Sequence, residues 1–167
     1  VSETIFNVAI GATFNHNNGT ISFSTSYYCC GAFIFTLDVP TTLTLNNVIA
    51  NVTDGDWANA GTLAVASGDT IVVNGNFTHT QNRLGGNWEV AGDISNVSIG
   101  ASAEGGAGVI TMTGNGNQTY TYGTSGVASK LTINKSGGTV TPASGTINLS
   151  TSSFTLTVGS FTAPTGT

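Results

Sequence analysis

The segment Thr42-Leu43-Thr44-Leu45-Asn46 decides the class of fold, because polar and apolar side chains alternate at every position along it. Side chains of a β-strand point alternately to opposite faces of the sheet, so this pattern predicts a strand with one buried face and one wet face. Threonine suits the wet face, since its branched Cβ favours the extended backbone. The same alternation recurs at residues 20–24, 130–134 and 154–158.

No window of the chain has the i, i+3, i+4, i+7 spacing of apolar residues that an amphipathic helix needs, so we expect an all-β fold. Glycine and asparagine pairs such as Asn18-Gly19 and Asn115-Gly116 separate the expected strands, and both residue types tolerate the positive φ of tight turns. Many short strands with tight corners fit two architectures, a parallel β-helix and an antiparallel β-sandwich.

The chain also repeats itself. Residues 43–47 return 88 residues later as 131–135, and residues 19–23 return 89 residues later as 108–112. Two further matches, 66–68 with 143–145 and 77–80 with 154–157, lie 77 residues apart, so the second copy lacks the region around residues 54–61. Repetition of this kind is typical of stacked architectures, which tolerate inserted residues because each coil contacts only its neighbours.

We therefore expect a parallel β-helix, with the antiparallel sandwich as the alternative. Residues 1–167 would form one β-solenoid unit of about seven coils, each of roughly 20 to 25 residues. Residues 1–12 are expected to be a cap or an exchanged strand, residues 13–101 a first repeat, and residues 102–167 a second, incomplete repeat.

Composition excludes two kinds of partner. The 167 residues include three basic and eight acidic side chains, a net charge of −5. Phosphate neutralisation needs clustered Lys and Arg, so we expect no nucleic-acid partner. The apolar runs are far shorter than the roughly 20 residues that span a bilayer, so we expect no membrane insertion. The start at Val1, without a signal region, fits a processed secreted protein or an internal fragment.

Four segments carry a resemblance to a known group of proteins. They are Gly-x-Trp-x-Val-x-Gly-x-Ile at residues 86–94, and residues 114–119, 131–141 and 159–162. Over residues 13–167 the chain resembles long bacterial surface repeat proteins. The resemblance implies a right-handed parallel β-helix at the cell surface that acts as an adhesin, a stalk or a matrix fibre, and it supplies no catalytic residues.

The adjacent cysteines Cys29 and Cys30 are a candidate disulfide. Neighbouring Cα atoms lie about 3.8 Å apart, below the usual disulfide range, so a bridge within the pair would be strained. The hypotheses are a vicinal disulfide, an intermolecular bridge that locks a fibre, or two reduced thiols. An extracellular location favours oxidation.

Asp54, Asp56 and Asn59 are a weak candidate for calcium, because carboxylate and amide oxygens are the ligands that calcium prefers. The complete EF-hand pattern is absent, and the alternative is a polar corner loop in which aspartate caps turns. Trp57 in the same stretch either stacks on a sugar or covers the end of the core, whereas Trp88 alternates with Val90 and is expected in the core.

Seven asparagines lie in Asn-x-Ser/Thr sequences and are candidates for N-glycosylation. They are Asn18, Asn51, Asn76, Asn96, Asn117, Asn134 and Asn148.

We expect no enzyme, no resident metal and no cofactor. A zinc site needs three or four converging ligands, and His16 and His79 lie far apart without a nearby cysteine or carboxylate pattern. The carboxylates are scattered and Arg83 is the single arginine, so the clustered acids and bases of polysaccharide-cleaving β-helices are missing.

Three functions follow as expectations. The first is a structural, self-assembling segment of an extracellular fibre, filament or adhesin stalk, whose partner is itself. The second is a binding module that uses threonine rows, such as Thr42 with Thr44 and Thr155 with Thr157, to bind ice or a surface polysaccharide. The third is a pilin-like subunit whose residues 1–10 are donated to a neighbouring subunit.

Overall fold

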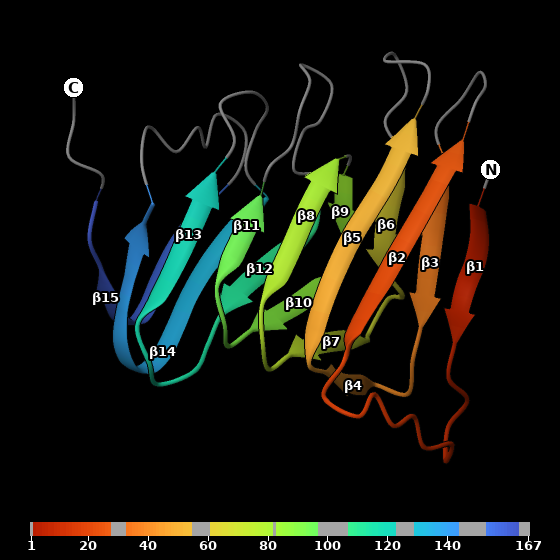
Figure 1. Ribbon diagram of the computed structural model, residues 1–167, viewed down its shortest axis with the longest axis horizontal. Helices are drawn as coiled ribbons and strands as arrows, with labels where there is room; N and C mark the ends of the chain where they lie inside the picture. Colours follow the sequence, from red (N-terminus) through yellow and green to blue (C-terminus); the bar gives the residue numbers. More distant parts are fainter. Residues whose placement is uncertain are drawn as a thin grey trace.

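The structure is a computed structural model that describes residues 2–27, 33–54, 61–81, 83–96, 107–122, 129–143 and 153–163. Within these ranges it contains fifteen strands and no helix, so the all-β expectation is confirmed. The molecule is elongated, with the first strand at one end of its longest axis and the last strand at the other (Figure 1).

All thirteen strand pairings among the described residues are parallel, which confirms the parallel β-helix and makes the antiparallel sandwich wrong. The chain winds around three faces. The first face is a separate four-stranded sheet in the order β1 (Ser2–Asn7), β3 (Ile34–Asp38), β6 (Thr62–Val65) and β9 (Arg83–Gly85).

The second and third faces belong to one eleven-stranded sheet that bends at a corner. The second face contains β4 (Thr42–Leu45), β7 (Thr70–Val73), β10 (Asn87–Val90) and β12 (Val109–Met112). The third face contains β2 (Thr20–Tyr27), β5 (Asn47–Asp54), β8 (Phe77–Gln81), β11 (Ile94–Asn96) and β13 (Gln118–Tyr122). The last two strands, β14 (Lys130–Pro142) and β15 (Phe154–Phe161), run around the corner and belong to both faces.

The third face is crossed seven times, by β2, β5, β8, β11, β13, β14 and β15, which agrees with the expected seven coils. Coil length varies more than expected: Trp88 aligns with Ile71, 17 residues earlier, whereas Phe77 aligns with Val48, 29 residues earlier. Connections between the first and second faces and between the second and third faces have at most five residues. Connections that leave the third face run to twelve residues, so most of the variation in length lies there.

Inward side chains stack on their equivalents in the next coil and form the core. On the second face two buried columns run along the axis. One is Leu43, Ile71, Trp88, Ile110 and Leu131, and the other is Leu45, Val73, Val90, Met112 and Ile133. The two columns make the core continuous along the rod. Each fully buried side chain in them contributes about 1.5–3 kcal/mol to the free energy of unfolding.

These columns explain only part of the repetition in the sequence. Leu43 and Leu131 lie in one column four coils apart, as a repeat would require. Ile21 and Ile110, which also match in sequence, lie on the third and second faces. The structural repeat is therefore the single coil. The boundary between residues 101 and 102 lies outside the described residues, so the division into two copies stays a prediction.

The N-terminal strand is part of its own chain's first face. β1 pairs in parallel with β3, and the amide of Val8 extends the pairing by donating to the carbonyl oxygen of Asp38 at 2.9 Å. A glycine makes one of the tight corners: Gly86 alone joins β9 to β10, with a φ of +73°. A Cβ at Gly86 would lie 2.5 Å from the carbonyl oxygen of Val65, so no other residue fits without a shift of the backbone.

Candidate functional site

Asparagine and aspartate side chains tie successive coils together at the corner before the third face. The Oδ1 atom of Asn47 accepts from the amide of Asn76 at 2.8 Å, and the Oδ1 atom of Asn76 accepts from the amide of Asp93 at 3.0 Å. Asp93 continues the ladder by accepting from the amide of Thr119 at 2.7 Å. Each bond is worth about 1 kcal/mol and fills a gap in the backbone pairing at the corner. The sequence predicted turns here but not bonds between coils.

A lysine is buried in the sixth coil. The Nζ atom of Lys135 donates to the carbonyl oxygen of Thr113 at 3.0 Å and to the Oε1 atom of Gln118. The Nε2 atom of Gln118 in turn donates to the carbonyl oxygens of Val90 at 3.1 Å and Gly92 at 2.5 Å. Burial lowers the pKa of Lys135, because the desolvated amine is less stable when charged. The group joins three coils through neutral acceptors.

That lysine was missed in the sequence, although a signal was present. Leu131, Ile133 and Lys135 lie at alternate positions of one strand, so they share its inner face. His79 lies two positions after Phe77 in its strand, and Asn96 lies two positions after Ile94. The same alternation therefore places both polar side chains on the inner face.

A second polar group lies inside the third face. The Nδ1 atom of His79 lies 3.2 Å from the Oδ1 atom of Asn96 in the next coil. Tyr120 follows in the fifth coil, where burial raises its pKa to about 12, although the nearby Asn96 amide lowers it in part. No group of three metal-ligating side chains occurs in the part of the chain that the structure describes.

The N-terminal end of the interior is closed by aromatic rings. Phe14, from the connection between β1 and β2, meets the ring of Phe6 edge-on, with centroids 5.4 Å apart. Phe6 also meets Phe23 of β2 at 5.5 Å. These three residues, which we call the aromatic plug, cover the first coil where the second face has no strand among the described residues.

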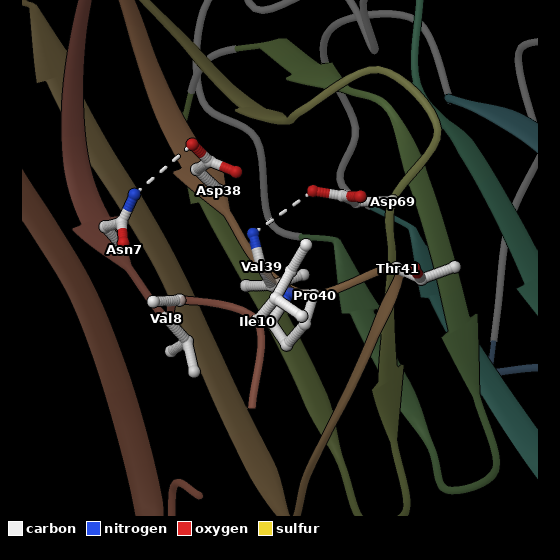
Figure 2. Close-up of a pocket in the computed structure, with 9 residues that line it drawn as sticks. Asn7, Val8, Ile10, Asp38, Val39, Pro40, Thr41 and Asp69 are labelled. Carbon is white, nitrogen blue, oxygen red and sulfur yellow. Dashed lines mark hydrogen bonds between the residues drawn. The ribbon is translucent and has the colours of Figure 1, made fainter. Parts of the chain in front are cut away.

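A pocket of about 350 Å³ lies beside this end, at the corner between the first and second faces (Figure 2). Its two carboxylates are already bonded to the chain. Asp38 accepts from the Nδ2 atom of Asn7 at 3.3 Å, and Asp69 accepts from the amide of Val39 at 3.1 Å. The pocket is therefore a gap in a corner that these aspartates stabilise.

The C-terminal end is open. β15 pairs with β14 and, among the described residues, with no strand beyond it. Leu156 continues the column of Ile133, yet Leu156 is 50% exposed and Ile133 is 0% exposed. Val158 is 54% exposed, and residues 136–167 contain no charged side chain. An edge without charge or proline is a template for pairing with another strand.

Several predicted site residues lie outside the described residues: Cys29, Cys30, Asp56, Trp57 and Asn59. Asp54 is the last residue of β5. The disulfide, the calcium site and the sugar contact stay predictions. Trp88 is buried as expected, and its Nε1 atom donates to the carbonyl oxygen of Gly85 at 3.0 Å.

The candidate glycosylation sites differ in their surroundings. Exposed residues are Asn18, Asn76, Asn117 and Asn134, while Asn51 is half-buried, Asn96 is buried against His79 and Asn148 lies outside the described residues. Asn117 also accepts from the amide of Thr139 at 3.1 Å.

The histidines and threonines are dispersed. His16 accepts from the amide of Asn18 at 3.1 Å in the first coil, whereas His79 lies in the third. The outward column through Thr44 on the second face continues as Val72, Glu89, Thr111, Thr132 and Thr155. Valine and glutamate therefore interrupt the row of hydroxyls.

The fold and these ends define the chain as a parallel β-solenoid. No family model, no curated protein and no solved structure matches it. A helix long and apolar enough to cross a membrane is not found in the described ranges.

Proposed function

We propose that this chain is a structural, self-assembling segment of an extracellular fibre, filament or adhesin stalk. One observation carries the proposal: the last described strand, β15, is uncharged and has no partner beyond it among the described residues, and its Leu156 is half-exposed in a column that is otherwise buried. Solenoid ends of this kind either stack on more coils or need a cap.

The build of the rod supports this role. Hydrophobic columns and the Asn47–Asn76–Asp93 ladder link each coil to the next, so stiffness is distributed along the whole axis. The resemblance to bacterial surface repeat proteins and the low content of charge point to the cell surface. In this proposal the function lies in the shape and the ends of the molecule, without a catalytic centre or a cofactor.

Electron microscopy of the native material, labelled with an antibody against residues 2–27, tests the proposal. We expect labelled rods or fibres at the cell surface whose length grows by about 4.8 Å for each coil in the full reading frame. Preimmune serum on the same cells is the control. Labelling confined to the cell interior, or a reading frame that makes only compact particles, would contradict the proposal.

A further inference from the structure

The two ends of the solenoid differ in charge, and they also differ in whether a segment of the chain covers the hydrophobic interior. Residues 1–82 contain five acidic and no basic side chains, and residues 105–167 contain Lys130 and Lys135 and no acidic side chain. Among the described residues, Asp38 and Asp69 accept hydrogen bonds from Asn7 and from the amide of Val39, and neither they nor Glu3 form an ion pair there.

The two ends also match in geometry. Among the described residues, β2 is the outermost strand of the third face at the N-terminal end. The outermost segment of that face at the C-terminal end is Ser160-Phe161, the last part of β15. All strands of this face run parallel, so a simple translation along the axis brings the free edge of β15 against the free edge of β2 in another copy. The third face then continues without a change of direction.

We infer that the C-terminal end of one copy binds the N-terminal end of a second copy, with β15 pairing in parallel with β2. The inference rests on the proposed function and specifies which surfaces meet. On the third face, backbone hydrogen bonds between Ser160-Phe161 and β2 supply affinity. On the second face, Leu156 of one copy is covered by residues 8–19 of the other. The acidic side chains of the N-terminal end and Lys130 orient the encounter, whereas the buried Lys135 takes no part in it. These charges are screened within about 10 Å at 0.1 M salt, so they affect the rate more than the affinity.

A two-fold arrangement of C-terminal ends fits less well. It would place β15 antiparallel to its copy, bring two Lys130-bearing coils together and leave both acidic ends uncompensated. Association by translation is open-ended, so it produces filaments, whereas the two-fold contact stops at a dimer.

Three serines on the outward side of the third face give a matched test. Ser22 lies in the first coil, Ser95 in the fourth and Ser160 in the last. Ser22→Asp and Ser160→Asp each place a charge on a free edge, and Ser95→Asp places the same charge in the middle of the rod.

Sedimentation velocity of the full chain over a range of concentrations gives the readout, with circular dichroism to check that each variant is folded. We expect the wild type and Ser95→Asp to grow beyond a dimer with concentration. Ser22→Asp and Ser160→Asp should each associate about tenfold or more weakly. An equimolar mixture of these two variants should form a 1:1 complex and stop, because only one working junction remains.

Other outcomes overturn the inference. A wild type that stays monomeric contradicts end-to-end association, and surface rods built from further coils of a longer chain would still be compatible with that result. A dimer in which Ser22→Asp associates normally and Ser160→Asp does not shows two-fold pairing. Association of all three variants shows an interface elsewhere on the rod.

Discussion

The two ends of the solenoid solve the same problem in different ways. At the N-terminal end, Phe14 crosses the open interior and packs against Phe6, which packs on Phe23. At the C-terminal end, the ring centroids of Phe154 and Phe161 lie 4.9 Å apart, but both rings remain half-buried and Leu156 is 50% exposed. A connecting segment closes one end, and nothing among the described residues closes the other.

The difference shows that covering the end of a parallel coil requires a segment that leaves the winding path. Residues 8–19 do this in the first coil, where they replace a strand of the second face. The last coil instead keeps winding through β15, so its inner side chains stay ready for a further layer.

The largest expected loss of stability comes from the column that contains Ile133 and Leu156, where a covered and an uncovered side chain can be compared directly. Ile133→Ala should lower the free energy of unfolding by about 2–5 kcal/mol, because a buried side chain leaves a cavity. Leu156→Ala, one coil further out in the same column, should cost about 1 kcal/mol, since half of the side chain is already in water. Urea denaturation of both variants measures the contrast, and equal losses would show that another layer covers Leu156.

Titration of Tyr120 tests how far the closed interior extends toward the open end. Its pKa is raised from 10.0 to about 12, so its contribution to stability is present below pH 10 and lost as the pH rises through 12. The loss should reach about 3 kcal/mol. The lowered pKa of Lys135 acts oppositely: stability rises with pH up to that group's unfolded value of 10.5.

Unfolding free energies measured between pH 10.5 and 12, above the range in which Lys135 acts, should therefore decline in the wild type and decline less in Tyr120→Phe. The difference in tyrosinate absorbance between these two proteins gives the titration of Tyr120 independently. A midpoint near 10 would mean that water reaches the fifth coil from the open end.

A third change removes the cover at the closed end. Phe14→Ala should cost about 2 kcal/mol, because a half-buried ring and its edge-on contact with Phe6 are lost. Hydrogen exchange should speed up in β1 and β2 and stay unchanged in β12. Phe161→Ala is the matched variant at the open end and should leave exchange in β2 as it is.

The smallest expected loss of stability concerns the asparagine and aspartate hydrogen bonds that join successive coils between the two ends. Asn47→Ala should cost about 1 kcal/mol, since the amide of Asn76 loses its acceptor. Asn134→Ala is the control, because Asn134 is exposed and makes no side-chain hydrogen bond among the described residues. Thermal unfolding followed by circular dichroism compares the two, and equal midpoints would contradict a stabilising ladder.

Alternation predicted where strands form, and the burial of Leu43 and Leu45 beside the exposed Thr42 and Thr44 confirms it. Alternation alone does not distinguish parallel from antiparallel pairing, because both place successive side chains on opposite faces. The 88-residue repetition favoured the correct architecture. Among the matches that the structure describes on both sides, however, only that of residues 43–47 with 131–135 brings a pair such as Leu43 and Leu131 onto one face.

The interior polar groups could have been predicted from parity but were not, because composition suggests that lysine stays in water. Lys135 escapes that tendency by bonding to Thr113 and Gln118, which lie 22 and 17 residues earlier in sequence. Such contacts depend on the register between coils, and coil lengths from 17 to 32 residues hide that register from the sequence.

The length of the connections that leave the third face has a consequence for how such a rod can change. Connections from the first face to the second and from the second to the third have at most five residues, whereas connections that leave the third face have up to twelve. Extra residues added there leave the rise per coil and the two hydrophobic columns untouched. An epitope or a whole domain grafted into these connections would be displayed at a fixed axial spacing along the rod. Diverging copies of the chain would accumulate their differences in length in the same connections.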